Sequence, residues 1–312
     1  MNMSRTATHP RLRARAILVS LRAYSFPASV MPILVAASLA WVQHQPIAWY
    51  LFPFVIVSAL ALHAGTNLIN DLEDYRRGLD TAEYPGSSGM LAGPLSPRAV
   101  AWEAVGAFAL AVTAALPVVA IRGPAIALLA LAGLWGAYGY SGRPFGLKYH
   151  GAGDMLVFVM MGPGLVAGGY YALTGVLSVE AAALSLPVGT LVTAVLHGNN
   201  IRDREHDRQA GLSTLADRLG PTGALALFIG LLATSYAVPF AMILSGRLSA
   251  WTLLLVATLP MAVSAALSVA RNIYCPRQLA DIDRRLAGLH GAYGLALMLG
   301  LLIEGIGLMI VD

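Results

Sequence analysis

The sequence predicts an all-α polytopic membrane protein with nine transmembrane helices and a cytoplasmic N-terminus. Hydrophobic residues make up 57% of the 312 residues and charged residues only 12%, about half the share that is usual in soluble domains. The mean hydropathy is +0.69. The apolar residues lie in continuous runs and do not alternate with polar ones, which favours membrane-spanning helices over the strands of a barrel.

Nine apolar segments have about the 20 residues that cross a bilayer as a helix. A polar, Arg-rich tail precedes them, and the first run continues without the small-residue cleavage site of a signal peptide. We therefore expect a cytoplasmic tail at residues 1–25 and a single intramembrane domain at residues 26–312. In chain order, the segments lie at about 26–44, 50–70, 99–120, 123–141, 153–174, 178–199, 221–244, 249–271 and 288–310.

The basic residues predict the orientation of these spans. Lys and Arg concentrate in the cytoplasmic loops of polytopic proteins. Of the 20 Lys and Arg residues, all except Arg122 and Arg247 lie before the first span or after an even-numbered span. The C-terminus is then external. We expect a multi-pass protein of the inner (plasma) membrane with its site facing the cytoplasm.

Composition also excludes several classes of function. The net charge of +4 follows from this topology, so we predict no nucleic-acid partner. The single cysteine, Cys275, cannot form an internal disulfide, which excludes a disulfide scaffold. The lipid bilayer is the partner that the composition does predict.

Two cytoplasmic loops, after the second and sixth spans, carry matching polar clusters. Asn70 precedes Asp74 by four residues, and Asn199 precedes Asp203 by four, which indicates a weak internal repeat of four spans with a ninth added. The clusters read Gly65-Thr66-Asn67-Leu68-Ile69-Asn70-Asp71-Leu72-Glu73-Asp74 and His197-Gly198-Asn199-Asn200-Ile201-Arg202-Asp203-Arg204-Glu205-His206-Asp207.

If the helices continue through these clusters, Asp71 shares a face with Asp74, and Asp203 shares one with Asp207. Carboxylates on one face repel each other unless a cation lies between them. Mg²⁺ prefers oxygen ligands and usually shares them with substrate phosphates, which the nearby arginines also suit. We predict that these four aspartates hold Mg²⁺; ordinary solvated loop charges are the alternative.

Other polar residues near the clusters complete the predicted site. Lys148 and Arg143, after the fourth span, and Arg202, in the second cluster, are the predicted ligands of a diphosphate. Positive-inside topology also explains basic residues at these positions. Three asparagines are expected to complete the metal or acceptor shell, with capping of a span end as the alternative. They are Asn67, Asn70 and Asn200.

The two acidic motifs resemble those of the UbiA superfamily of intramembrane prenyltransferases. The first is Asn70-Asp71-x-x-Asp74 with Asp80, and the second is Asp203-x-x-x-Asp207. The resemblance covers about residues 20–305 and is greatest to the 1,4-dihydroxy-2-naphthoate prenyltransferase branch. The stretches that carry it are Gly93-Pro94-Leu95-Ser96-Pro97, Tyr140-Ser141-Gly142-Arg143-Pro144, Leu147-Lys148-Tyr149-His150-Gly151-Ala152-Gly153-Asp154, Gly198-Asn199-Asn200-Ile201-Arg202-Asp203 and Asp207-Arg208-x-Ala210-Gly211.

This resemblance implies Mg²⁺-dependent transfer of an isoprenyl chain from a prenyl diphosphate to an aromatic acid. The implied acceptor is 1,4-dihydroxy-2-naphthoate, which would lose its carboxylate in menaquinone biosynthesis. One feature departs from that branch. Its usual arginine after a Gly/Ser pair is missing from Gly86-Ser87-Ser88-Gly89-Met90, and this changes how the diphosphate or the acceptor is held.

Three other functions fit parts of the pattern. Another aromatic acceptor, or cyclisation of the substrate as in a terpene cyclase, would use the same ionising machinery. A secondary transporter would also hold carboxylates in a membrane bundle. Transporter sites usually lie near the bilayer midplane in broken helices, whereas these carboxylates lie at cytoplasmic span ends.

Overall fold

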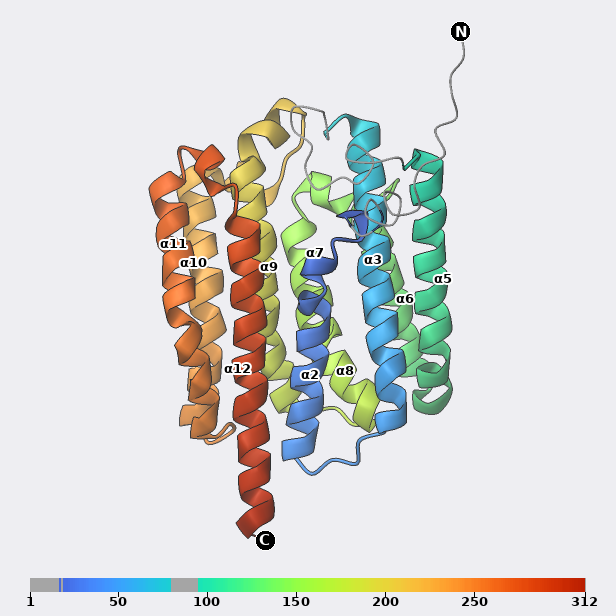
Figure 1. Ribbon diagram of the computed structural model, residues 1–312, viewed down its shortest axis with the longest axis vertical. Helices are drawn as coiled ribbons and strands as arrows, with labels where there is room; N and C mark the ends of the chain where they lie inside the picture. The colour runs from blue at the N-terminus through green and yellow to red at the C-terminus, as the bar shows by residue number, and fades with distance from the viewer. Residues whose placement is uncertain (1–16, 18, 80–94, 312) are drawn as a thin grey trace.

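The computed structural model describes residues 17, 19–79 and 95–311, and none of these residues forms a strand. The helical prediction is therefore confirmed for the described part of the chain. Its longer helices, labelled in Figure 1, are α2 (Pro27–Val42), α3 (Phe52–Arg77), α5 (Pro97–Arg122), α6 (Pro124–Gly139), α7 (Gly153–Val159), α8 (Val166–Thr174), α9 (Val179–Gln209), α10 (Leu215–Leu244), α11 (Leu259–Asn272) and α12 (Ile282–Val311).

Eight helical segments among the described residues are long and apolar enough to cross a membrane. The predicted fourth span corresponds to α6, which has only 16 residues. At 1.5 Å per residue its length is about 24 Å, less than the roughly 30 Å of a hydrocarbon core. Length and composition thus support eight of the nine predicted spans, and α6 is shorter than a standard span.

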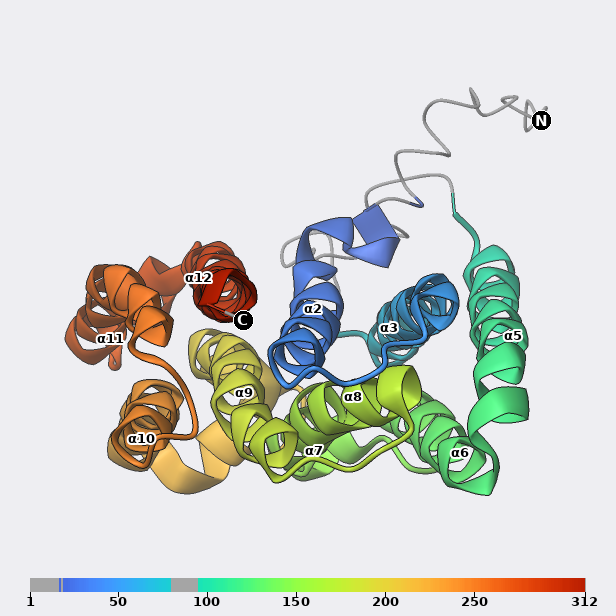
Figure 2. The same ribbon diagram turned by 90° about the horizontal axis from the view of Figure 1, so that it is seen from below.

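The long helices run side by side along one direction and form a bundle (Figures 1 and 2). α12 packs against α2 and α9, α10 packs against α9, and α3 packs against α5. The main core joins α2, α8, α9, α10 and α12, and its largest fully buried side chains include Tyr170, Phe228 and Tyr293. This packing holds α2, α3 and α9 around the site described below.

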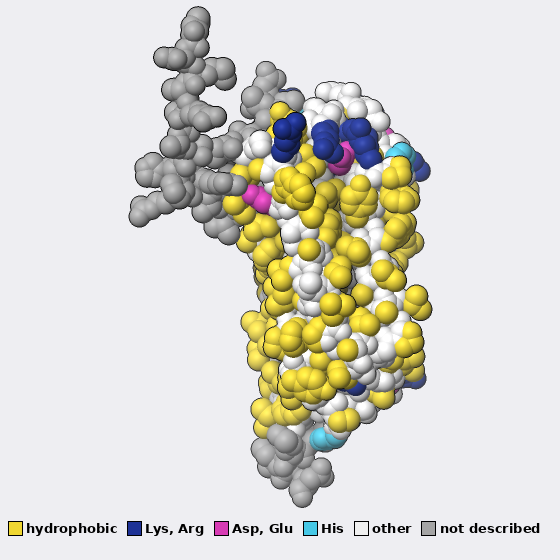
Figure 3. Space-filling model, turned by 90° about the vertical axis from the view of Figure 1, so that its right-hand side faces the viewer, with side chains coloured by type: hydrophobic (Ala, Val, Ile, Leu, Met, Phe, Trp, Pro, Cys, Tyr) yellow, Lys and Arg dark blue, Asp and Glu magenta, His cyan; other side chains and the backbone are white. Residues whose placement is uncertain are grey.

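The outside of the bundle has the polarity of a membrane protein. Figure 3 shows the face on the right-hand side of Figure 1, where hydrophobic side chains cover most of the height. Basic side chains gather at the end where α3 and α9 finish, which is uppermost in Figure 1. We call this the α3/α9 end. It is the end that the sequence predicts to be cytoplasmic.

Both acidic clusters are helical, as predicted. α3 continues to Arg77 and stops where Gly78 adopts a left-handed conformation, φ 70°. α9 continues to Gln209, beyond its acidic cluster. The clusters therefore form the last turns of two helices that finish at the same end of the bundle (Figure 1).

The predicted fifth span is interrupted. Between α7 and α8, residues Met160–Gly164 form a π-helical segment that contains Pro163. A Cβ atom on Gly162 would lie 2.6 Å from the Ser185 carbonyl oxygen and 2.9 Å from the Gly189 Cα. Only glycine permits this contact with α9. α7 also contacts α9 at the second cluster, where Asp154 meets His197 and Asn200.

Candidate active site

A polar cavity of about 1350 Å³ opens at the α3/α9 end. Both acidic clusters contribute to its lining, so the structure brings together motifs that are four spans apart in the sequence. Its polar lining residues are Arg22, Tyr24, Asn70, Asp74, Tyr140, Lys148, Tyr149, Asn199, Asn200, Arg202, Asp203, His206, Asp207, Thr214, Arg277, Asp283 and Arg284.

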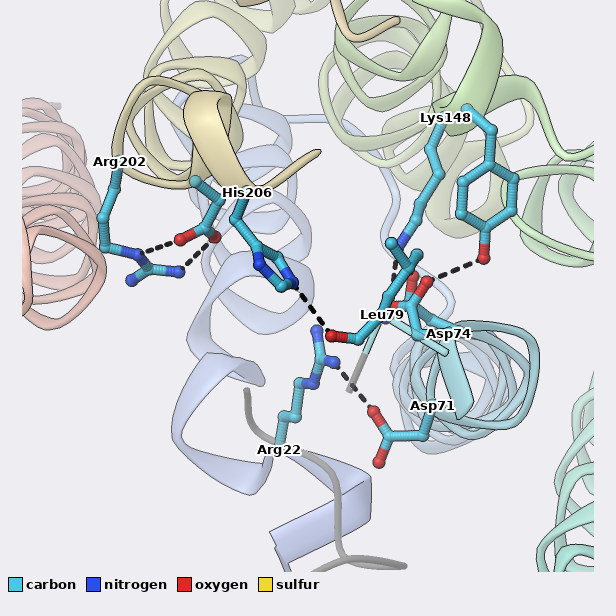
Figure 4. Close-up of polar contacts among 10 residues, drawn as sticks. Arg22, Asp71, Asp74, Leu79, Lys148, Arg202 and His206 are labelled. Atoms are coloured by element: carbon cyan, nitrogen blue, oxygen red, sulfur yellow. Dashed lines mark hydrogen bonds and ion pairs between the residues drawn. The ribbon is translucent and has the colours of Figure 1, made fainter. Parts of the chain in front are cut away.

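Asp74, the last residue of the first cluster, accepts hydrogen bonds from three side chains. Its Oδ2 accepts hydrogen bonds from Asn70 Nδ2 at 2.9 Å and from Lys148 Nζ at 2.7 Å. Its Oδ1 accepts one from the Tyr149 hydroxyl at 2.8 Å. Lys148 also donates to Asn70 Oδ1. The predicted residues Asn70, Asp74 and Lys148 therefore form one contact network, and Figure 4 shows Lys148 reaching towards Asp74.

Tyr149 is a fixed donor in this network. Burial and the neighbouring Asp74 carboxylate raise the pKa of its hydroxyl well above the usual value. The phenol therefore stays protonated at neutral pH and can donate to Asp74. The Arg77 guanidinium lies 3.8 Å from the centre of the Tyr149 ring, a cation–π contact that holds the ring in place.

The second cluster places Asp203 and Asp207 in the cavity together. Arg202 forms two hydrogen bonds with Asp203, at 2.8 and 2.7 Å, and lies 3.6 Å from Asp283 of α12. Asp207 is half-buried and is exposed to the negative charges of Asp203 and Asp74. Positive charge between these carboxylates would relieve that repulsion.

The two asparagines that precede Asp203 have different surroundings. Asn200 donates to Asp154 Oδ2 at 3.1 Å, and the Asp154 Oδ1 atom pairs with His197 Nδ1 at 2.8 Å. Asn199 Oδ1 is buried and has no hydrogen-bond partner among the described residues. Asn199, one turn before Asp203, is therefore an oxygen donor that the predicted site omits.

Arg22 is a second cavity residue that the predicted site omits. Its Nη2 donates to Asp71 Oδ1 at 2.8 Å, and the Asp71 side chain is fully buried (Figure 4). Asp71 does not line the cavity, but Arg22 does. The structure thus separates Asp71 from Asp74 and places an arginine between Asp71 and the site. Asp71 directly follows the predicted second span at 50–70, and an acidic residue so close to the membrane was the available signal for a basic partner.

Two further predicted residues lie outside the lining. Asn67 donates to the Leu21 carbonyl at 2.9 Å and so ties α3 to the segment before α2. Arg143 pairs with Glu73 at 2.9 Å, and its side chain is 61% exposed. Both contacts connect structural elements. Asp80 and the segment 86–90 lie outside the described residues.

The donor set of the cavity suits a hard divalent cation. Asp74, Asp203, Asp207 and Asn199 offer carboxylate and amide oxygens, the ligand type that Mg²⁺ prefers. Within the described ranges, no three His, Cys, Asp or Glu side chains are close enough to hold a metal ion by themselves. The arrangement suits a cation that completes its shell with a bound phosphate.

A smaller, apolar cavity of about 180 Å³ lies deeper in the bundle. Its walls come mainly from α3, α6, α8 and the π-helical segment before α8, and His63 is among its few polar residues. Tyr140 lines this apolar cavity and the polar cavity. The site therefore presents a charged compartment next to an apolar one, with an aromatic ring between them.

Comparison with known proteins agrees with this arrangement. The UbiA prenyltransferase family model matches residues 29–280. The chain belongs to the UbiA prenyltransferase family. It is therefore a prenyltransferase of this family, as its two acidic motifs predicted.

Two relatives match most of the chain. It is 28% identical over 284 residues to the 1,4-dihydroxy-2-naphthoate octaprenyltransferase of Bacillus subtilis, covering 91% of each chain. It is 30% identical over 292 residues to the human UbiA prenyltransferase domain-containing protein 1, covering 92% of this chain and 85% of the human protein.

Solved structures of UbiA homologues share the fold. An apo structure from Aeropyrum pernix superposes with a TM-score of 0.62 at 17% identity, over 91% of this chain and 98% of that one. A structure from Archaeoglobus fulgidus, bound to GPP and Mg²⁺, has a TM-score of 0.58 at 18% identity and covers 91% and 99%.

Proposed function

We propose that this UbiA-family protein transfers an isoprenyl chain from a prenyl diphosphate to 1,4-dihydroxy-2-naphthoate, with loss of the acceptor's carboxylate, in menaquinone biosynthesis. One observation carries the proposal: the ends of α3 and α9 meet in one cavity that combines carboxylates with basic residues. A prenyl diphosphate needs a charged site for its head and an apolar site for its tail, and both are present.

In this proposal Asp74, Asp203 and Asp207 hold Mg²⁺, with Asn70 and Asn199 as neighbouring oxygen donors. When bound, the metal would neutralise the charge that develops on the departing diphosphate. Asp71 is assigned to Arg22 instead, because it is buried in an ion pair outside the cavity lining.

Three basic side chains then bind the diphosphate oxygens: Lys148, Arg202 and Arg22. Each lines the polar cavity, and each is held in position by a carboxylate, namely Asp74, Asp203 and Asp71. Preorganised donors of this kind stabilise charge on a leaving group without reorganising during the reaction. Arg143 is not included, because it pairs with Glu73 outside the lining.

The proposed reaction breaks the bond between the allylic carbon and the diphosphate oxygen, and the electron pair leaves with diphosphate. A ring carbon of the acceptor then bonds to the allylic carbon, and CO₂ leaves. Water must be kept from the allylic cation. Tyr140, which lines both cavities, can shield the cation with its ring face.

The naphthoate acceptor rests on the sequence motifs and on the 28% identity with the Bacillus subtilis naphthoate octaprenyltransferase. Arg22, proposed above as a diphosphate ligand, lines the cavity close to the first cluster. It offers positive charge on a chain whose 86–90 segment has no arginine.

We further propose that α6 is the fourth of nine spans, and that local thinning of the bilayer and snorkelling of flanking residues compensate for its short apolar length. With nine spans, the N-terminus and the α3/α9 end face the cytoplasm and the C-terminus lies outside. The charge distribution supports this topology, since all but two basic residues then fall on the cytoplasmic side.

The deciding experiment combines purified protein, Mg²⁺, labelled naphthoate acid and prenyl diphosphates of several lengths, followed by mass spectrometry. We expect a prenylated naphthoate without its carboxylate. Prenylation of 4-hydroxybenzoate in its place, or a cyclised hydrocarbon with no ring attached, would overturn the acceptor assignment. Counterflow in liposomes with no diphosphate release would favour the transporter. Aspartate variants that keep full activity would overturn the proposed metal site.

A further inference from the structure

A second binding feature lies on the outside of the bundle, away from the polar and apolar cavities. It is a groove between α11 and α12 of about 500 Å³. We call it the α11/α12 groove. Its lining residues are Pro260, Val263, Ser264, Leu267, Ser268, Arg271, Asn272 and Arg285. None of them lines the two cavities of the active site.

Polarity changes along this groove. The part farther from the α3/α9 end is apolar, and its Val263 and Leu267 side chains are each 47% exposed. The other end carries Arg271, in the last turn of α11, and Arg285, at the start of α12. The groove therefore joins an apolar channel to a cationic end.

The two arginines have donors available for an anion. Arg271 is exposed and has no carboxylate partner within the described part of the chain. Arg285 uses its Nε to contact Asp281 at 2.8 Å, and a guanidinium has five N–H donors. Arginine forms strong paired hydrogen bonds with phosphate oxygens. Among the residues that line the groove there is no carboxylate.

The length of the groove fits one lipid chain. Pro260 and Arg271 are eleven residues apart, which corresponds to about 16 Å along a helix. That is close to half of the roughly 30 Å hydrocarbon core, the depth of one leaflet. A second copy of this chain fits less well, because an isologous contact centred here would bring the arginines of both copies together.

We propose that the α11/α12 groove binds an anionic glycerophospholipid. The acyl chain lies along Val263 and Leu267, and the phosphate contacts Arg271 and Arg285. Ser268, between Leu267 and Arg271 on α11, lies at the depth of the glycerol and ester groups, and Asn272 lies beside Arg271 at the phosphate level. The site holds a structural lipid of one leaflet and is separate from the prenyl-transfer site.

The test uses the full chain in detergent and native mass spectrometry, with phosphatidylglycerol or phosphatidylcholine of identical acyl chains. We expect the protein to retain phosphatidylglycerol at least tenfold better. The Arg271→Ala/Arg285→Ala protein should lose most of this preference. Arg98→Ala, which removes an exposed arginine at the same end on α5, should keep it.

Two further arms test the parts of the site separately. Val263→Trp fills the apolar channel and keeps both arginines, so it should also reduce phosphatidylglycerol retention. Glycerophosphoglycerol, the headgroup without acyl chains, should not displace the lipid at equal concentration. The proposal is overturned if the double variant retains the lipid like wild type, if Arg98→Ala loses it equally, or if Val263→Trp has no effect. Prenyl transfer in detergent, with a Tm for each variant, shows that the proteins are folded.

Discussion

Replacing Asp71 should destabilise the protein without changing its metal requirement. Asp71 is fully buried and pairs with Arg22, whose side chain is 23% exposed. Removing one partner of a buried ion pair costs about 3–5 kcal/mol, because a charge is left without its counterion. Since water reaches part of Arg22, we expect the lower end of that range, about 3 kcal/mol, for Asp71→Ala.

Asp203→Ala is the matched comparison. Arg202 and Asp203 are each about a fifth exposed, and Arg202 has a second carboxylate, Asp283, at 3.6 Å. Loss of such a partly exposed pair costs about 1 kcal/mol or less. Asp203 lines the cavity, so its loss should remove most activity or raise the Mg²⁺ concentration needed for half-maximal rate.

The assay measures two quantities for each variant: the free energy of unfolding by denaturant in mixed micelles, and the rate of prenyl transfer as a function of Mg²⁺. The structural assignment predicts a stability defect for Asp71→Ala and a metal defect for Asp203→Ala. If Asp71→Ala keeps wild-type stability and needs more Mg²⁺, Asp71 is a metal ligand, as the sequence pattern alone predicts.

Four other outcomes follow from the site and the topology. Lys148→Met should lower kcat/KM for the prenyl diphosphate by about 10²–10³-fold, the usual effect of losing one donor to developing charge, whereas Arg98→Met should leave it unchanged. EDTA should abolish turnover, and added Mg²⁺ should restore it; turnover in EDTA would contradict the metal site. Tyr149→Phe should cost about 1 kcal/mol of stability but leave the shape of the pH–rate profile between pH 6 and about 9 intact, because the raised pKa keeps this phenol protonated. A reporter that functions only in the cytoplasm should be silent when fused to Asp312, and a signal there would mean that the span count is wrong by one.

The bundle was predictable because its signals are local. A run of about 20 apolar residues specifies a membrane helix whatever its neighbours are, and the described segments agree with eight predicted spans. The continuation of α3 and α9 through their acidic clusters was likewise predictable from spacing. Asn70 to Asp74 is a four-residue step, and both residues line the cavity.

Other features depend on tertiary packing and could not be read from spacing. Residues four apart on a helix are separated by about 40° around its axis, and residues three apart by about 60°. The larger angle is enough for Asp74 to face the cavity while Asp71 faces Arg22. Arg22, the ion-pair partner of Asp71, lies 49 residues away in the sequence, so the spacing within the cluster does not indicate this contact.

The hydrogen bonding of Asn199 and Asn200 and the interruption of the fifth span also depend on tertiary packing. Sequence favoured Asn200 over Asn199, but α7 brings Asp154 to Asn200 and leaves Asn199 Oδ1 without a hydrogen-bond partner among the described residues. The π-helical segment at Met160–Gly164 occurs where Gly162 meets α9. An apolar run in the sequence predicts a membrane span, but it does not predict where two helices come into close contact.

The charges of the polar cavity explain why metal and substrate should bind together. Among its described lining residues, four aspartates face five Lys and Arg side chains, so the site is close to electrically neutral before any ligand enters. An isoprenyl diphosphate brings several negative charges into this partly enclosed space, where unbalanced charge is costly. The basic residues cannot balance that charge alone, because Asp74, Asp203 and Asp71 already pair with Lys148, Arg202 and Arg22. A divalent cation on Asp74 and Asp203 would offset their negative charge and leave more of the positive charge of Lys148 and Arg202 for the diphosphate. Chelation should therefore weaken binding of the prenyl diphosphate as well as its turnover, and equilibrium binding of a non-hydrolysable diphosphate analogue with and without Mg²⁺ measures the difference directly.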